Sequence, residues 1–297
     1  MNAGSTMQTP GTEVAAEATP ETDAPAASDS SGATIRVADQ TRLLGPPTVV
    51  AAGVIGLWYL FTYFVLDRDQ QFFLPPLHRV VDVGFLTWGN LEQVLLGLWR
   101  TTQVTLVGLA LAIVGGMAIA VVMSQARWIE RSVFPYAVAL QAVPIVAISP
   151  LIGLWWGWDF QSQVIVTIII SIFPIITNTL FGLRSVEPSM HDLLTLHRVG
   201  RWTRFRKLQL PHALPAIFTG FRISAGLAVV GAIVGEFFFK GGTYGTEGLG
   251  QLLFLFQNQL SGSKLVAGII FSSLLGVALF WFFGWAGRRL TGHWYSA

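Results

Sequence analysis

Apolar residues fall into six long runs along the chain, and the shorter segments between them hold most of the charged residues. A helix needs roughly 20 residues to cross the hydrocarbon core of a bilayer, and each run approaches or exceeds that length. Backbone groups in lipid must be satisfied within the segment, so the runs predict helices rather than an open sheet. The expected fold class is all-α, a polytopic membrane protein with six transmembrane helices. The predicted spans are residues 48–66, 101–123, 132–156, 162–183, 213–236 and 265–287.

The first 45 residues differ from the rest. Residues 1–34 contain no Lys or Arg and few large apolar residues, but much Ala, Thr, Ser, Pro and acidic residues. Such a segment buries too little apolar surface to offset the entropy lost on ordering. It also lacks the basic-then-apolar order of a secretory signal. We therefore expect a disordered cytoplasmic tail over 1–45 and a transmembrane domain over 46–297.

The distribution of positive charge predicts the orientation. With the N-terminus in the cytoplasm, the inner segments hold twelve Lys/Arg and the outer segments five. This asymmetry follows the positive-inside rule, although Arg68, Arg79 and Arg100 all fall on the first outer segment. The expected location is the cell (inner or plasma) membrane, with several passes and both termini cytoplasmic.

Composition narrows the classes of function. Hydrophobic residues make up 53% of the chain and charged residues 11%, against about 25% charged in soluble domains. Membrane lipid is therefore the expected surrounding, and the net charge of +2 gives no sign of nucleic-acid binding. The chain has no cysteine, which excludes thiolate catalysis and cysteine-ligated metals. No His cluster or carboxylate pair is placed together, so neither a catalytic residue nor a metal site is expected.

Two connections between spans carry patterns of their own. Apolar residues at helical spacing across 77–88 predict an amphipathic helix lying on the membrane surface. The connection 237–264 is rich in glycine, which permits tight turns and close backbone approach. It is either a plain flexible loop or a shaped element that caps a cavity.

The segment 183–211, which we call the basic segment, holds six Lys/Arg. Its apolar residues recur every three positions, and on one straight helix that spacing spreads the apolar stripe around the axis. Gly200 lies at the midpoint and is a poor residue for a helix interior. The pattern predicts two short helices within 188–209, bent near Gly200 and ended by Leu210-Pro211. Periodicity alone leaves open whether this element docks a cytoplasmic protein or lies on lipid headgroups.

The run from Leu183 to Phe238 resembles the permease subunits of bacterial ABC importers, in the branch for nitrate, sulfonates, taurine and vitamin precursors. Phe73-Leu74-Pro75-Pro76, the run 143–158, and Phe173-Pro174 with Asn178 resemble further motifs of that family. The similarity covers roughly residues 70–290. It implies the type I ABC importer permease architecture.

The family's coupling motif reads Glu-Ala-Ala, three residues, then Gly, and runs on to a Leu-Pro. Counted back from Leu210-Pro211, the resemblance places Asp192-Leu193-Leu194 at Glu-Ala-Ala and Arg198 at the glycine. The sequence thus departs from the motif at both places. The residues that the resemblance assigns to ATPase coupling are Asp192, Leu193, Leu194, Gly200, Arg201, Trp202, Phe205, Leu210 and Pro211.

The resemblance also implies partners. They are a cytoplasmic ABC ATPase dimer, an extracytoplasmic solute-binding protein and a second permease copy, forming a homodimer. The chain has no GxxxxGK[ST] phosphate loop, so ATP and Mg are expected on the ATPase. This chain is then a non-catalytic subunit that binds no cofactor.

Ionisable and amide side chains within spans are costly and are therefore candidates for the transport path. They are Gln141, Asn178, Arg222 and Glu236. Each has a simpler interpretation: the amides as interhelical ties, Arg222 as a structural residue at the permease interface, and Glu236 as a solvated helix end.

The preferred function is the permease of an ABC importer, and the run 227–238 resembles the vitamin-type members most. The expected substrate is a small heterocyclic vitamin or precursor, of the riboflavin or thiamine-pyrimidine type. Aliphatic sulfonate, taurine or nitrate is the alternative. A stand-alone secondary transporter or channel is the alternative of another class, with a membrane enzyme behind it.

Overall fold

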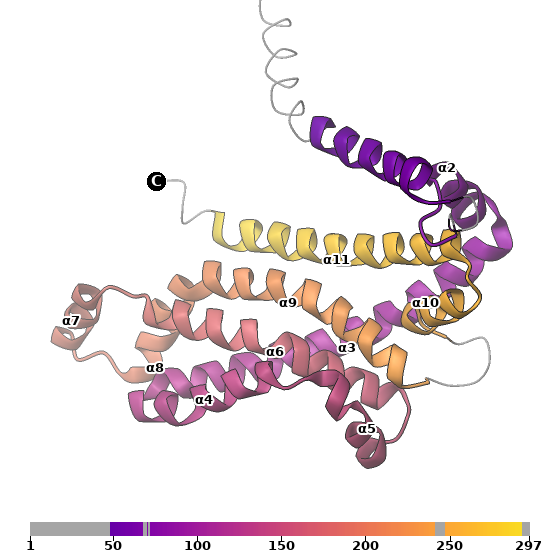
Figure 1. Cartoon of the computed structure of the whole chain (residues 1–297). Coiled ribbons are helices and arrows are strands. Elements are labelled where there is room, and N and C mark those ends of the chain that lie inside the picture. Colours follow the sequence, from indigo (N-terminus) through magenta and orange to yellow (C-terminus); the bar gives the residue numbers. More distant parts are fainter. Residues whose placement is uncertain (1–47, 68–69, 71, 241–246, 293–297) are drawn as a thin grey trace, which may run out of the picture. The chain divides into compact units, whose positions relative to one another are not determined.

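The computed structural model describes residues 48–67, 70, 72–240 and 247–292, and every regular element among them is helical (Figure 1). The predicted tail 1–45 lies outside these residues, as do Arg68 and the glycines at 241, 242 and 245. The chain divides into two units between residues 56 and 57, and the second unit, from Leu57 on, contains the packed helices. In chain order the elements are the helix Thr48–Val65, whose end is the π-helical η1 (Phe61–Val65), α2 (Leu77–Val80), η3 (Val81–Leu86), α3 (Trp88–Gln125), α4 (Arg127–Ala142), α5 (Ile145–Trp156), α6 (Phe160–Arg184), α7 (Pro188–Leu196), α8 (Arg201–Arg204), η4 (Phe205–Gln209), α9 (Leu210–Phe238), α10 (Leu249–Asn258) and α11 (Gly262–Thr291).

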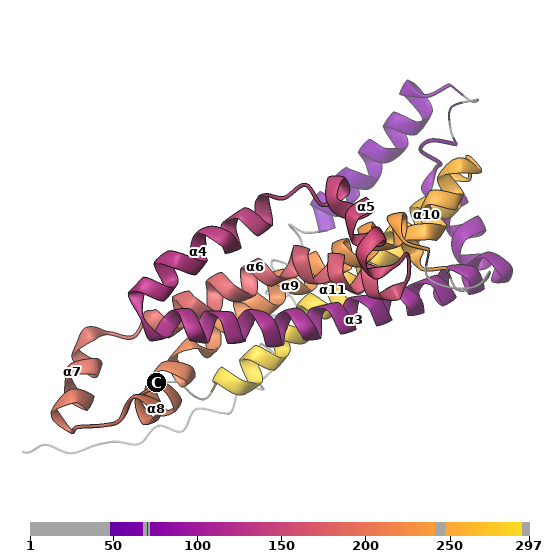
Figure 2. The same ribbon diagram turned by 90° about the horizontal axis from the view of Figure 1, so that it is seen from below.

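Within the described residues, five helices are long and apolar enough to cross a membrane, and the pair α4 and α5 makes up to a sixth. The predicted third span, 132–156, is not one straight helix, because α4 and α5 meet at an angle of 99°. The chain turns at Val143 and Pro144, which both have extended backbone (Figure 2). Pro144 lacks an N–H and disfavours the helical conformation in the residue before it, which explains the break.

Helices α6 and α9 form the packed centre, and α3 lies against both. Their backbones approach so closely that a Cβ added at Gly231 would lie 2.8 Å from the Cα of Thr167. A Cβ at Gly220 would lie 3.0 Å from the carbonyl oxygen of Pro174. In the same contact, the Ser224 hydroxyl donates a 2.7 Å hydrogen bond to the Ser171 carbonyl. Association of helices in lipid relies on such small residues and interhelical hydrogen bonds.

The predicted helix across 77–88 is present as α2 and η3, followed directly by α3. Its apolar side contacts another helix: Val80 is buried with Val266 and Ala267 of α11. The Phe85 ring stacks on Phe271 at 5.0 Å. The stretch is therefore anchored to α11.

The described part of the connection 237–264 contains a packed helix, α10, rather than a plain loop. Leu249, Leu252 and Phe256 of α10 are buried together with Val94 of α3. Of the two interpretations that the glycines left open, the shaped element is the one observed.

The contact between α6 and α9 yields a stability prediction. Gly231→Leu forces a side chain into the backbone of α6 and should lower the free energy of unfolding by about 1–3 kcal/mol. Gly226→Leu is the matched control. Gly226 lies on the same helix, α9, and a Cβ there meets nothing within 4 Å. Thermal unfolding in detergent, followed by tryptophan fluorescence, should show a lower Tm for the first variant alone. Equal melting temperatures would contradict this description of the core.

Candidate functional site

The basic segment folds as one short helix, α7, followed by the start of a longer helix at α8, and the chain bends near Gly200 between them as the spacing predicts. Helix α7 ends at Leu196, and Gly200 caps the start of α8 with extended backbone, φ −63° and ψ 154°. The hydroxyl of Thr195 accepts a 2.8 Å hydrogen bond from the Arg204 guanidinium, which ties the two helices together. Both views place α7 beyond the ends of α6 and α9 (Figure 1, Figure 2).

The prediction that Leu210-Pro211 ends this element is wrong. Leu210 is helical, and residues Arg201–Phe238 form one continuous 38-residue helix made of α8, η4 and α9. The π-helical turn η4 comes directly before Leu210 and Pro211. Its wider geometry leaves room for a proline ring that would clash with the preceding carbonyl of a regular α-helix.

The residues assigned to coupling divide into two groups. Leu194, Phe205, Leu210 and Pro211 are half-buried, and Phe205 and Leu210 pack against the core. The exposed group, which we call the coupling surface, consists of Asp192, Leu193, Gly200, Arg201 and Trp202. Trp202 is 71% exposed and stacks on Phe205, with ring centroids 5.7 Å apart. An exposed tryptophan beside charged residues fits a surface that contacts either a protein or the membrane interface.

Arg198 occupies the position that the resemblance gives to the motif glycine. Its φ is +50°, so its backbone is left-handed, a conformation that glycine adopts freely and that costs other residues about 1 kcal/mol. At this position the sequence has arginine in place of the motif's glycine, although the backbone conformation still favours glycine. The strain falls in the four residues that join α7 to α8.

The four candidates for the transport path do not form one site. Gln141 is exposed at the end of α4, just before the turn into α5. Asn178 donates a 2.8 Å hydrogen bond to the Pro174 carbonyl on its own helix. The Arg222 guanidinium lies over the Phe280 ring of α11, 4.2 Å from its centroid. Arg222 and Glu236 are separated by about 21 Å along α9.

Glu236 is not a solvated helix end, because it is 2% exposed. Its Oε2 accepts hydrogen bonds from the Thr101 hydroxyl of α3 (2.9 Å) and the Gly250 N–H of α10 (2.7 Å). The Leu249 N–H donates to the Thr101 hydroxyl at 2.8 Å. The first turn of a helix leaves N–H groups without backbone partners, and here side chains from two other helices satisfy them.

A second set of bonds holds the same region. The Phe239 carbonyl accepts from the side-chain amides of Gln163 on α6 (2.7 Å) and Gln251 on α10 (2.9 Å). Gly248 allows the Glu236 carboxyl group to approach the start of α10, because a Cβ at Gly248 would collide with that group. We call four side chains the α10 clamp: Thr101, Gln163, Glu236 and Gln251. Their hydrogen bonds hold Phe239, at the end of α9, and Leu249 and Gly250, at the start of α10.

Sequence reasoning found one member of the clamp, Glu236, and missed Thr101, Gln163 and Gln251. Each is a polar residue near the end of an apolar segment, where water is the default partner. The dense glycines at 248 and 250 were the available signal of close approach. They did not indicate which side chain approaches.

The clamp predicts how a change at Glu236 affects α10. In Glu236→Ala, the Gly250 N–H loses its side-chain acceptor, and a buried donor left unsatisfied costs about 1–3 kcal/mol, so opening of the first turn becomes roughly tenfold more frequent. Hydrogen exchange should therefore accelerate at Leu249 and Gly250. Glu236→Gln keeps an acceptor oxygen and should retain most of the protection. Unchanged exchange in the alanine variant would show that the clamp does not hold α10.

Comparison with known proteins identifies the family to which this chain is similar. Residues 112–292 match the family described as "Binding-protein-dependent transport system inner membrane component". The formylaminopyrimidine transport permease protein of Halalkalibacterium halodurans is 36% identical over 177 residues, which is 60% of this chain and 69% of that protein. The riboflavin transport system permease protein of Chloroflexus aurantiacus is 33% identical over 165 residues, 56% of this chain and 60% of that protein. Relatives named for aliphatic sulfonates, bicarbonate and nitrate are between 24% and 30% identical.

Solved structures share the fold. A chain of a bacterial alginate ABC transporter, in complex with its pentasaccharide-bound periplasmic protein, matches with a TM-score of 0.59 and 14% identity. The match covers 84% of this chain and 98% of that one. At this identity the likeness concerns the architecture alone, and it is the architecture of type I ABC importer permeases.

Proposed function

Because the chain belongs to the family of inner-membrane components of binding-protein-dependent transport systems, we propose that it forms the translocation path for a small heterocyclic vitamin or vitamin precursor. The substrate class is of the riboflavin or thiamine-pyrimidine type. The observation that carries the proposal is the basic segment, which is bent near Gly200, exposes the coupling surface and continues from α8 into the membrane helix α9 without a break. A stand-alone carrier would have no use for it.

In the proposed mechanism, the coupling surface docks into a groove on a separate cytoplasmic ATPase, which binds ATP and Mg. Closure of an ATPase dimer then shifts the permease between two states, as expected for a bistable packed assembly biased by ligand binding. A displacement at Trp202 reaches Glu236 along one continuous helix. This chain contributes no ATP chemistry.

The remaining partners complete the proposal. A solute-binding protein delivers the substrate from outside, a second copy of this chain forms the other half of the path, and lipid surrounds both. The twelve-to-five asymmetry of positive charge supports cytoplasmic termini in the inner or plasma membrane.

The substrate proposal rests on relative similarity. The two relatives named for a formylaminopyrimidine and for riboflavin are more similar to this chain than those named for bicarbonate or nitrate. The same machinery importing an aliphatic sulfonate, taurine or nitrate is the second candidate.

Transport in vesicles tests the function. Membrane vesicles holding this chain, its ATPase and the solute-binding protein should accumulate the substrate only when ATP is supplied on the ATPase side. Vesicles with this chain alone should show no accumulation under an imposed ion gradient. Gradient-driven uptake by the chain alone would replace the importer with a secondary transporter.

Trp202 gives a mutational test of the coupling surface. Because Trp202 is largely exposed, Trp202→Ala should leave membrane insertion and the folded state unchanged. Loss of a large aromatic anchor at an interface costs about 2 kcal/mol or more, so ATPase binding and ATP-dependent uptake should fall at least tenfold. Gly200 is a second site, since a Cβ there meets nothing within 4 Å among the described residues, so the loss expected in Gly200→Ala arises mainly at the partner.

The matched control is Trp128→Ala, which removes an equally exposed tryptophan (71%) from the first turn of α4. Its uptake should stay near the wild-type rate. Normal coupling in both Trp202→Ala and Gly200→Ala would mean that the basic segment only contacts lipid headgroups.

A further inference from the structure

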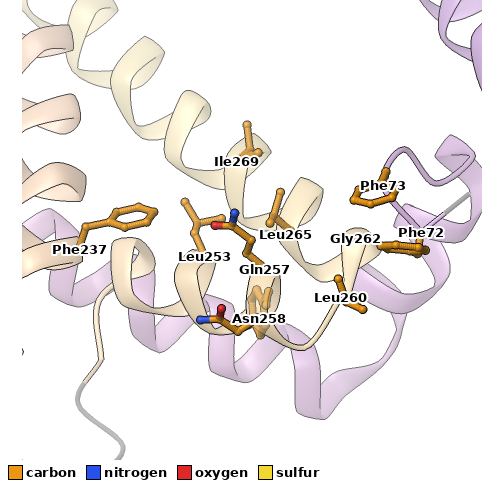
Figure 3. A pocket seen from close by; sticks show the side chains of 11 residues that line it. Phe72, Phe73, Phe237, Leu253, Gln257, Asn258, Leu260, Gly262, Leu265 and Ile269 are labelled. Carbon is orange, nitrogen blue, oxygen red and sulfur yellow. The ribbon is translucent and has the colours of Figure 1, made fainter. Parts of the chain in front are cut away.

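A cavity of about 730 Å³ lies beside the α10 clamp. It is bounded by the end of α9, by α10, by the start of α11 and by the stretch that precedes α2. Figure 3 shows Phe237 at one end, Phe72 and Phe73 at the other, and the Gln257 amide between them. The volume is within the range of small-molecule sites, about 300–1,000 Å³.

The lining has a distinct chemistry. Four phenylalanines reach it from three separate segments: Phe72 and Phe73, Phe237, and Phe256. The amides of Gln257 and Asn258 come from the last turn of α10. None of the eleven described residues that line the cavity carries a charge.

This chemistry selects among ligands. An anion placed here would lose its hydration without gaining a cation, which is costly. The ammonium group of Lys264 lies near, but it faces the Phe256 ring at 5.8 Å and is not part of the lining. Aromatic side chains provide flat surfaces for stacking, and each amide offers both a donor and an acceptor to the edge of a ring.

We propose that this cavity binds an uncharged heteroaromatic ring, namely that of the imported substrate, stacked on the phenylalanines and hydrogen-bonded by Gln257 and Asn258. The inference rests on the proposed function and narrows its substrate class. It disfavours sulfonate, taurine and nitrate, which present a charged group.

The clamp gives the site its shape. Phe237 directly follows Glu236 on α9, while Phe256, Gln257 and Asn258 follow the turn of α10 that Glu236 holds. The bond between Glu236 and Gly250 therefore fixes the position of the α10 side of the cavity relative to Phe237. A preformed site loses less entropy on binding.

Binding to the purified full-length chain in phospholipid nanodiscs tests the proposal. Riboflavin, followed by quenching of its fluorescence, and 4-amino-5-hydroxymethyl-2-methylpyrimidine, followed by competition, are the probes. The double variant Gln257→Ala/Asn258→Ala should weaken binding of the preferred probe at least tenfold. Both residues are exposed, so the fold should be unaffected.

The control is Gln259→Ala, which removes an exposed amide that lies between Asn258 and Leu260 in the sequence but is not part of the lining. Its affinity should equal that of the wild type, and taurine and nitrate should not compete. Unchanged affinity in the double variant, competition by these anions, no binding of either probe to the wild-type chain, or displacement of the probe by added phospholipid would each overturn the proposal. Phospholipid displacement would identify an acyl chain as the occupant.

Uptake measurements distinguish a failure of this site from a failure of the proposed function. ATP-dependent uptake of the probe by the wild type, with equal uptake by the double variant, would leave the importer intact and remove the site. Failure of the wild type itself to take up either probe with its ATPase would count against the proposed substrate class.

Discussion

The close approach of α6 and α9 is the constraint on which the other features depend. Helices in lipid gain no hydrophobic stabilisation from meeting one another, so they associate through backbone proximity and interhelical hydrogen bonds. Gly220 and Gly231 permit that proximity, and the hydrogen bond between Ser224 and Ser171 lies between them along α9. The middle of α9 is therefore fixed against the core. Its two ends therefore lie at set distances from that core.

The two ends of α9 are chemically unlike. At one end the helix continues without interruption into α8, where Trp202 and Arg201 are exposed. At the other end it terminates in a buried carboxylate that holds the first turn of α10. The two features are roughly 50 Å apart along a single helix. A continuous helix thus joins the exposed surface at one end to the clamp at the other, and this connection is the physical basis of the proposed mechanism.

Sequence patterns predicted the elements that depend on local rules. The spacing of three in the basic segment, with Gly200 at its middle, predicted the bend that the structure contains. The long helices followed from apolar length, because lipid leaves the backbone few alternatives, but the predicted third span is divided into α4 and α5. Family membership came from the resemblance of whole motifs rather than from periodicity.

The features that sequence missed depend on contacts between distant segments. The burial of Glu236 arises from Thr101 and Gly250, which are 135 and 14 residues away from it. The 99° angle between α4 and α5 and the passage of the helix through Pro211 are set by geometry that a proline alone does not specify. The cavity combines side chains from four segments, none of which is distinctive by itself.

Labelling of a single cysteine tests most directly whether α9 links the coupling surface to α10. The chain has no cysteine of its own, so one introduced at Gln259, the exposed residue that caps the end of α10, reports on α10 alone. With the ATPase bound, a non-hydrolysable ATP analogue should change the rate of maleimide labelling severalfold, and without the ATPase it should have no effect. Equal labelling rates before and after nucleotide, in a complex that still transports, would contradict the account.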